Sequence, residues 1–169
     1  SLVTTDFRVV VADVDETPLP GEAPVRYVQR LAELKARTVA HEAVADEAVV
    51  AADTTVCFAD EIFGKPADKA DFLRMMRVLS GQTHQVYTGL CIIQASDVRT
   101  DVVCTDVSMR VLTQAECETY WLSGEPQDKA GGYGIQGLAA RFVRRIEGSY
   151  TNVVGLPLVE LEALLSDAP

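Results

Sequence analysis

The alternation of apolar and polar positions divides the chain into strands and helices. Runs of β-branched residues between turn residues predict strands over residues 7–12, 47–58, 84–94, 102–112 and 142–146. Apolar residues at helical spacing predict helices over residues 24–41, 68–79, 113–122 and 156–166. Strands that alternate with helices, together with a hairpin turning at Ser96-Asp97, predict an α/β fold with a mixed β-sheet flanked by helices. No linker or repeat interrupts the pattern, so one domain is expected over residues 1–169.

Residues that begin and end helices support these boundaries. Pro24 suits the first position of a helix, and Asp68 is an expected N-cap. Thr113 followed by Glu116 matches a capping box, in which each side chain bonds the other residue's backbone N–H.

Composition and charge narrow the possible partners. The net charge is −10, so neither nucleic acid nor an anionic membrane is an expected partner, because both bind clustered Lys and Arg. No apolar run is long enough to cross a bilayer and no signal peptide is recognisable, so a cytoplasmic protein is expected. A phosphorylated small molecule would need lysines and a metal ion that concentrate positive charge in one cleft. The four cysteines form no CxxC pair, which argues against a zinc site.

Asp53 is the strongest chemical signal. It is a carboxylate within the apolar run of residues 49–56, where burial is costly unless the group is paired, metal-bound or at an exposed strand end. It could bind Mg²⁺ or accept a proton from an attacking water. A turn cap or a residue on the solvated face of an edge strand is the structural alternative.

Three other charged residues also allow both a functional and a purely structural interpretation. Lys65 lies between a glycine and a proline, where it could contact a phosphate or simply be solvated. Lys35 continues the apolar stripe of its helix, so it either extends past the core edge or points into a cleft. Glu16 closes an acidic turn that could hold Mg²⁺ or only add solubility.

The glycine-rich stretch 129–137 could wrap backbone amides around a phosphate or a base. It matches neither the dinucleotide-binding nor the P-loop spacing. His84 is expected to be a hydrogen-bonded surface residue.

Six motifs, in order and with matching gaps, resemble those of the Maf family over nearly the whole chain. They are Arg30-Leu31-Ala32-x-x-Lys35-Ala36, Ala52-Asp53-Thr54, Gly64-Lys65-Pro66, Leu79-Ser80-Gly81-x-x-His84, Asp128-Lys129-Ala130-Gly131 and Gly148-Ser149-Tyr150-x-Asn152-Val153-Val154-Gly155. The resemblance implies the fold of the inosine triphosphate pyrophosphatases and hydrolysis of a nucleoside triphosphate to the monophosphate and pyrophosphate.

The resemblance also implies roles for single residues. Asp53 becomes the proton acceptor, and Glu16, Lys35 and Lys65 become further active-site positions. Glu16 and Asp53 are the expected contacts of a divalent cation, Mg²⁺ or Mn²⁺, and Lys129 is a further contact of phosphate or nucleotide.

Two positions indicate the branch of the family. Thr54, within Ala-Asp-Thr, and Gln136, within Gly-Ile-Gln-Gly, resemble the branch that acts on dTTP and UTP. The branch that acts on 7-methyl-GTP has Ser-Asp-Gln at the first motif and lacks the second. A glutamine amide can pair with the O4/N3 edge of uracil or thymine, including modified pyrimidines.

The family is associated with arrest of septum formation and with homodimers, and both are expectations here. The alternative to an enzyme is a nucleotide-binding regulator of cell division that acts through a protein partner. Family members begin with a short strand and a Ser-x-Ser-Pro-Arg-Arg loop that supplies basic phosphate contacts. The printed chain begins at Ser1, beyond that segment, so these contacts are expected to be absent from the 169 residues.

Overall fold

The computed structural model describes residues 6–44 and 47–166. A five-stranded sheet has the order β2-β1-β3-β4-β5, and every neighbouring pair is antiparallel. The strands are β1 (Ala48–Phe58), β2 (Glu61–Phe63), β3 (Thr83–Gln94), β4 (Asp97–Met109) and β5 (Val143–Glu147). The α/β class is confirmed, whereas the parallel pairing that a mixed sheet requires does not occur among the described strands.

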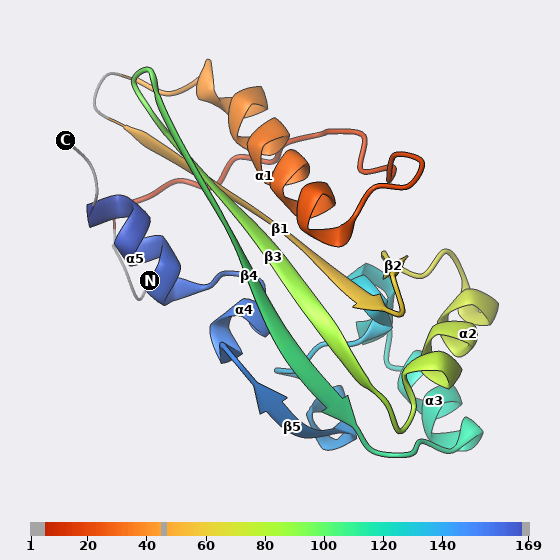
Figure 1. Ribbon diagram of the computed structural model, residues 1–169. Coiled ribbons are helices and arrows are strands. Elements are labelled where there is room, and N and C mark those ends of the chain that lie inside the picture. The colour runs from red at the N-terminus through yellow and green to blue at the C-terminus, as the bar shows by residue number, and fades with distance from the viewer. Residues whose placement is uncertain (1–5, 45–46, 167–169) are drawn as a thin grey trace.

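Helices cover both faces of this sheet. They are α1 (Pro24–Ala40), α2 (Lys69–Leu79), α3 (Gln114–Trp121), α4 (Tyr150–Val154) and α5 (Leu158–Ser166). Figure 1 shows α1 along one face of the long strands, α4 and α5 on the opposite side, and α2 and α3 gathered at one end. Short 3₁₀ turns over Glu125–Asp128, Ala130–Gly132 and Leu138–Phe142 connect α3 to β5.

Most predicted elements are confirmed within a few residues. Asp68 caps α2 by accepting a hydrogen bond from the Asp71 N–H, and the capping box of Thr113 and Glu116 forms at α3. The hairpin turns one residue earlier than predicted, at Ala95-Ser96, and Ala95 has a φ of 52°. As a result β4 begins at Asp97, five residues before the predicted start.

The strand predicted over residues 7–12 is wrong. These residues have no strand partner, and the side chains of Phe7, Val9 and Val11 are 61%, 82% and 88% exposed. A β-branched sequence favours extended backbone, but a strand also needs a neighbour that satisfies its N–H and C=O groups. The segment therefore reaches Glu16 as irregular chain.

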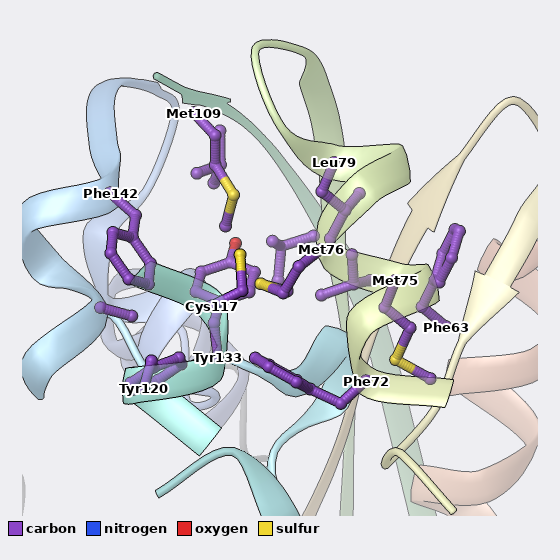
Figure 2. Packing of buried hydrophobic residues seen from close by; sticks show 14 residues of the cluster. Phe63, Phe72, Met75, Met76, Leu79, Met109, Cys117, Tyr120, Tyr133 and Phe142 are labelled. Carbon is purple, nitrogen blue, oxygen red and sulfur yellow. The ribbon is translucent and has the colours of Figure 1, made fainter. Parts of the chain in front are cut away.

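The larger core joins α2 and α3 to the sheet face that lies opposite α1 (Figure 2). Phe72 and Tyr120 belong to it, and their ring centroids are 6.0 Å apart. The glycine-rich stretch packs directly on this core. A Cβ atom on Gly131 would lie 2.7 Å from the Val56 side chain, and one on Gly132 would lie 2.9 Å from the Phe72 ring. Glycine at both positions lets the loop approach β1 and α2 closely.

On the other face, α1 packs equally closely on β3. A Cβ atom at Gly89 would lie 2.4 Å from the backbone oxygen of Val28 in α1, and Gly89 pairs with Asp53 across the sheet. This close contact brings the helix directly over the part of β1 that holds Asp53. In the part of the chain that is described, no helix is long and apolar enough to span a membrane.

Candidate active site

An open cleft of about 540 Å³ crosses β1 at Asp53 and Thr54. Its walls come from the N-terminal segment, α1, the turn at Gly64-Lys65, the glycine-rich loop and the end of α4. The sequence-predicted site residues all line it, namely Glu16, Lys35, Asp53, Thr54, Lys65, Lys129 and Gln136.

At one end of the cleft, Lys35 joins two carboxylates. Its Nζ atom lies 2.6 Å from Asp53 Oδ1 and 2.6 Å from Glu16 Oε1. Lys65 Nζ lies 3.7 Å from the second oxygen of Glu16. Of the two readings left open for Lys35, the one in which it points into a cleft is confirmed.

Burial sets the electrostatics of this cluster. Asp53 is only 8% exposed, and burial raises the pKa of its carboxyl, although the Lys35 ammonium opposes the shift. Burial alone would lower the pKa of Lys35, but the hydrogen bonds to Asp53 and Glu16 outweigh it, so that this pKa is raised. The hydrogen bond from Lys35 also lowers the pKa of Glu16. At neutral pH, Lys35 is therefore a cation between two carboxylates.

Tyr27 holds the N-terminal segment in place, and no sequence signal singled it out. Its hydroxyl donates a 2.8 Å hydrogen bond to the backbone oxygen of Glu16. The tyrosine is 6% exposed, lies in α1 and lines the cleft. Because residues 7–19 form no regular element, this bond and the ion pairs of Glu16 anchor the segment at the site.

The other end of the cleft is largely apolar. Val56, Val86, Val153 and Ile135 line it together with Tyr133. Gln136 lies on the exposed tip of the glycine-rich loop. A planar base would fit against the aliphatic and aromatic groups, with polar groups at the rim setting its orientation.

Glu125 fixes the loop that bears Gln136, and sequence reasoning missed it. Its carboxylate accepts hydrogen bonds from the Leu138 N–H at 2.9 Å and the Tyr120 hydroxyl at 2.7 Å. A Cβ atom on Gly137 would lie 2.3 Å from that carboxylate, so a side chain there would push the Glu125 carboxylate out of these hydrogen bonds.

His84 is not a surface residue, contrary to the prediction. It is fully buried on β3, and its Nε2 atom lies 2.7 Å from the Tyr133 hydroxyl. Burial lowers its pKa to about 4, so the ring is neutral. The preceding Thr83 is exposed, and alternation along the strand puts His84 on the opposite, covered face.

Comparison with known proteins identifies the family of this chain. The sequence profile described as "Maf-like protein" matches residues 1–168. The chain belongs to the Maf family. Proteins named dTTP/UTP pyrophosphatase are similar to this Maf chain over most of their length. The relative from Pseudoalteromonas translucida is 49% identical over 160 residues, which are 95% of this chain and 85% of the relative.

Two further relatives come from other bacteria. The Vibrio cholerae protein is 48% identical over 159 residues, covering 94% of this Maf chain and 85% of its own length. A Clostridium botulinum protein is 43% identical over 170 residues, covering 98% and 88%. Both are also named dTTP/UTP pyrophosphatase.

Residues from five of the six Maf motifs meet in the cleft although they are far apart in sequence, and the motif over residues 79–84 lies outside it. Asp53, Lys35, Glu16 and Lys65 form one contact network. Lys129 lines the same cleft and pairs with the adjacent Asp128 at 2.6 Å. Among the described residues, no group of three or more His, Cys, Asp or Glu side chains is arranged to hold a metal ion by itself.

Proposed function

We propose that this chain hydrolyses dTTP and UTP to the nucleoside monophosphate and pyrophosphate. The observation that carries the proposal is the division of one cleft into a lysine–carboxylate end and an apolar end lined by Gln136. Lys35, Lys65 and Lys129 line this cleft, but each lies near a carboxylate, so a triphosphate fits there together with a divalent cation that offsets its charge. The relatives named dTTP/UTP pyrophosphatase support the same substrates.

In the proposed reaction, water attacks the α-phosphorus and Asp53 accepts its proton. The bond from the α-phosphorus to the bridging oxygen breaks, and pyrophosphate leaves with that oxygen. The position of Asp53 suits this role because its carboxylate lines the cleft from the part of β1 that β2 does not cover. Lys35 orients Asp53 through the 2.6 Å contact, and Lys65 faces the phosphates from its turn.

The carboxylates fit a divalent cation that arrives with the nucleotide. Mg²⁺ usually binds one or two carboxylates and completes its shell with waters and substrate phosphates. Glu16 and Asp53 would supply these two carboxylates, because they converge on one point, the Lys35 Nζ atom, at 2.6 Å each. We propose that these two residues hold Mg²⁺ or Mn²⁺, which would offset the charge on the phosphates.

Release of pyrophosphate from UTP, dTTP, CTP and GTP in the presence of Mg²⁺ tests the proposal. The wild-type chain is expected to act on UTP and dTTP, and Asp53→Asn to lose most of this activity while still folding. Asp60→Asn is a matched control, because Asp60 is an exposed aspartate in the turn after β1.

Equal rates for the wild type and Asp53→Asn would remove Asp53 from the chemistry. Nucleotide binding without turnover would instead favour a nucleotide-binding regulator of cell division that acts through a protein partner. A cytoplasmic location, a homodimer and a role in septum arrest remain predictions.

A further inference from the structure

Thr54 lies on the face of β1 opposite Asp53, at the apolar end of the cleft. Asp53 pairs with Gly89 beneath α1, whereas Thr54 pairs with Thr88 on the side of α4. The hydroxyl oxygens of Thr54 and Thr88 are 2.8 Å apart. Either hydroxyl could donate in this bond if the pair were considered alone.

The next contact decides the direction. The Thr88 hydroxyl donates a 3.1 Å hydrogen bond to the backbone oxygen of Asn152. A carbonyl oxygen has no proton, and a threonine hydroxyl has only one to give. The Thr88 proton is therefore used on Asn152, and Thr54 must be the donor in its bond with Thr88.

Asn152 holds the end of this relay in place. It is fully buried, and its side-chain amide donates to the Val86 backbone oxygen at 3.0 Å and to the Thr105 hydroxyl at 2.8 Å. Its backbone oxygen also accepts a hydrogen bond from the Gly155 N–H at 2.9 Å. Since Thr88 is fully buried as well, water does not compete for the relay.

The relay leaves Thr54 with only acceptor lone pairs to offer a ligand. We propose that the Thr54 hydroxyl accepts a hydrogen bond from N3–H of uracil or thymine, and that Thr88 and Asn152 are positioning residues that fix its polarity. This inference rests on the proposed function. N3–H is the one donor on the edge of uracil and thymine, so an acceptor-only group has a single possible partner there.

Cytosine is disfavoured by the same polarity. A hydroxyl that faces N3 meets an acceptor in cytosine, because the donor on that edge is the 4-amino group at the neighbouring position, and two acceptors that face each other leave both without a hydrogen bond. Sites built around a specific hydrogen bond discriminate strongly against analogues that lack the matching group. Thr54 then accepts from N3–H, and the Gln136 amide is free to donate to O4.

The test compares kcat/KM for UTP and CTP in wild type, Thr88→Val and Thr54→Val. In Thr88→Val the Thr54 proton is released to face the cleft, so CTP is expected to gain roughly tenfold while UTP changes little. In Thr54→Val the acceptor is lost, so UTP is expected to lose roughly tenfold while CTP changes little. A gain for CTP in one variant and a loss for UTP in the other would show that the polarity of the Thr54 hydroxyl, and not a general loss of packing, sets the preference.

Two controls isolate the relay. Thr88→Ser keeps the hydroxyl and is expected to keep the wild-type UTP/CTP ratio. Thr83→Val removes a comparable 2.8 Å hydroxyl pair, Thr83 with Ser108, from the same strand outside the cleft, and should leave the ratio unchanged. A folded Thr88→Val protein with the wild-type ratio would overturn the inference, and so would a change of equal size in Thr83→Val.

If the wild-type chain proves not to turn over, calorimetric affinities for UTP and CTP replace the rates. The same shifts are then expected in the ratio of the two dissociation constants. An unchanged ratio in Thr88→Val would show that Thr54 contacts the sugar or nothing on the ligand, because ribose hydroxyls are the same in both nucleotides.

Discussion

Replacing Lys35 by methionine removes the ammonium group that both Asp53 and Glu16 contact. Methionine keeps the length and much of the packing of the lysine stem, so the change isolates the charge. Asp53 is 8% exposed and the Lys35 side chain 20% exposed, so the pair is close to a buried one. Loss of one partner from a buried pair costs about 3–5 kcal/mol, because the remaining charge has no compensation.

Partial exposure reduces this figure. Water reaches the Lys35 end of the contact and screens it, so we expect a loss of about 2–3 kcal/mol in the free energy of unfolding. For a chain of this size the melting temperature should fall by roughly 5–10 °C. Lys69→Met is the matched control, since Lys69 is exposed at the first turn of α2, and it should change stability by less than about 0.5 kcal/mol.

The loss should depend on pH in a defined direction. Without Lys35, only the weaker attraction of Lys65 opposes the burial that raises the Asp53 pKa, so this pKa rises further and the folded variant binds a proton at a pH where the unfolded chain does not. Its deficit should therefore be smallest near pH 4 and grow as the pH rises toward 7. Thermal melts of wild type and variant between pH 4 and 8 measure this difference.

A second substitution identifies the cause. An amide needs no counter-charge, so Lys35→Met with Asp53→Asn should be more stable than Lys35→Met alone. If the double variant were no more stable, the cost would not come from an uncompensated Asp53, and our account of the cluster would be wrong. None of these measurements depends on turnover.

Three further predictions concern single side chains. His84→Gln should reduce the loss of stability in acid. Because burial lowers the pKa of His84 to about 4, the wild type loses about 3 kcal/mol of unfolding free energy as the pH falls from 7 to 4, and the variant lacks this titration. Unfolding free energies measured at each pH compare the slopes of the two proteins. Glu125→Gln should lower the free energy of unfolding by about 1 kcal/mol, because an amide has one acceptor oxygen for the two donors, the Tyr120 hydroxyl and the Leu138 N–H. It should also alter nucleotide preference, since Glu125 holds the loop that bears Gln136. Thermal melting tests the first effect and substrate profiles the second, with Glu118→Gln as the control. Lys65→Ala should lower turnover on the order of 10–100-fold but leave the melting temperature nearly unchanged, since the side chain is 60% exposed.

The sequence predicted those elements whose signals are local. Pro24 starts α1, Asp68 caps α2 and the capping box opens α3, all as predicted. Each signal works over a few residues, so it does not depend on the rest of the fold. The three-residue strand β2 had no such signal and was missed, and the five-residue helix α4 was missed although Ser149 caps its start and Gly155 its end.

The errors came from contacts between distant segments. Residues 7–12 have strand composition, but no neighbouring strand pairs with them in the described chain. His84 is polar and follows a turn, yet the Tyr133 hydroxyl, distant in sequence, lets it be fully buried. Tyr27, Glu125 and Thr88 were missed for the same reason, because each acts through a partner that periodicity cannot identify.

The placement of Asp53 and Thr54 follows from the register of one strand. Neighbouring side chains on β1 point to opposite faces, so Asp53 meets Lys35 beneath α1 and Thr54 meets Thr88 beneath α4. A shift of one residue would exchange the two faces and put the carboxylate among the apolar residues. The register is held at this point because Gly89, opposite Asp53, is the position where α1 lies too close for any side chain.

The open edge of β1 then lets one cleft use both faces. The short β2 pairs only with Val56, Cys57 and Phe58, so among the described strands none covers this edge at Asp53 and Thr54. A ligand that wraps the edge can place its phosphates on one face and its base on the other. Two adjacent residues can thus contact opposite ends of a nucleotide, provided that the strand lies at an edge. A longer β2 that extended the pairing past Thr54 would close the cleft without changing any residue in it.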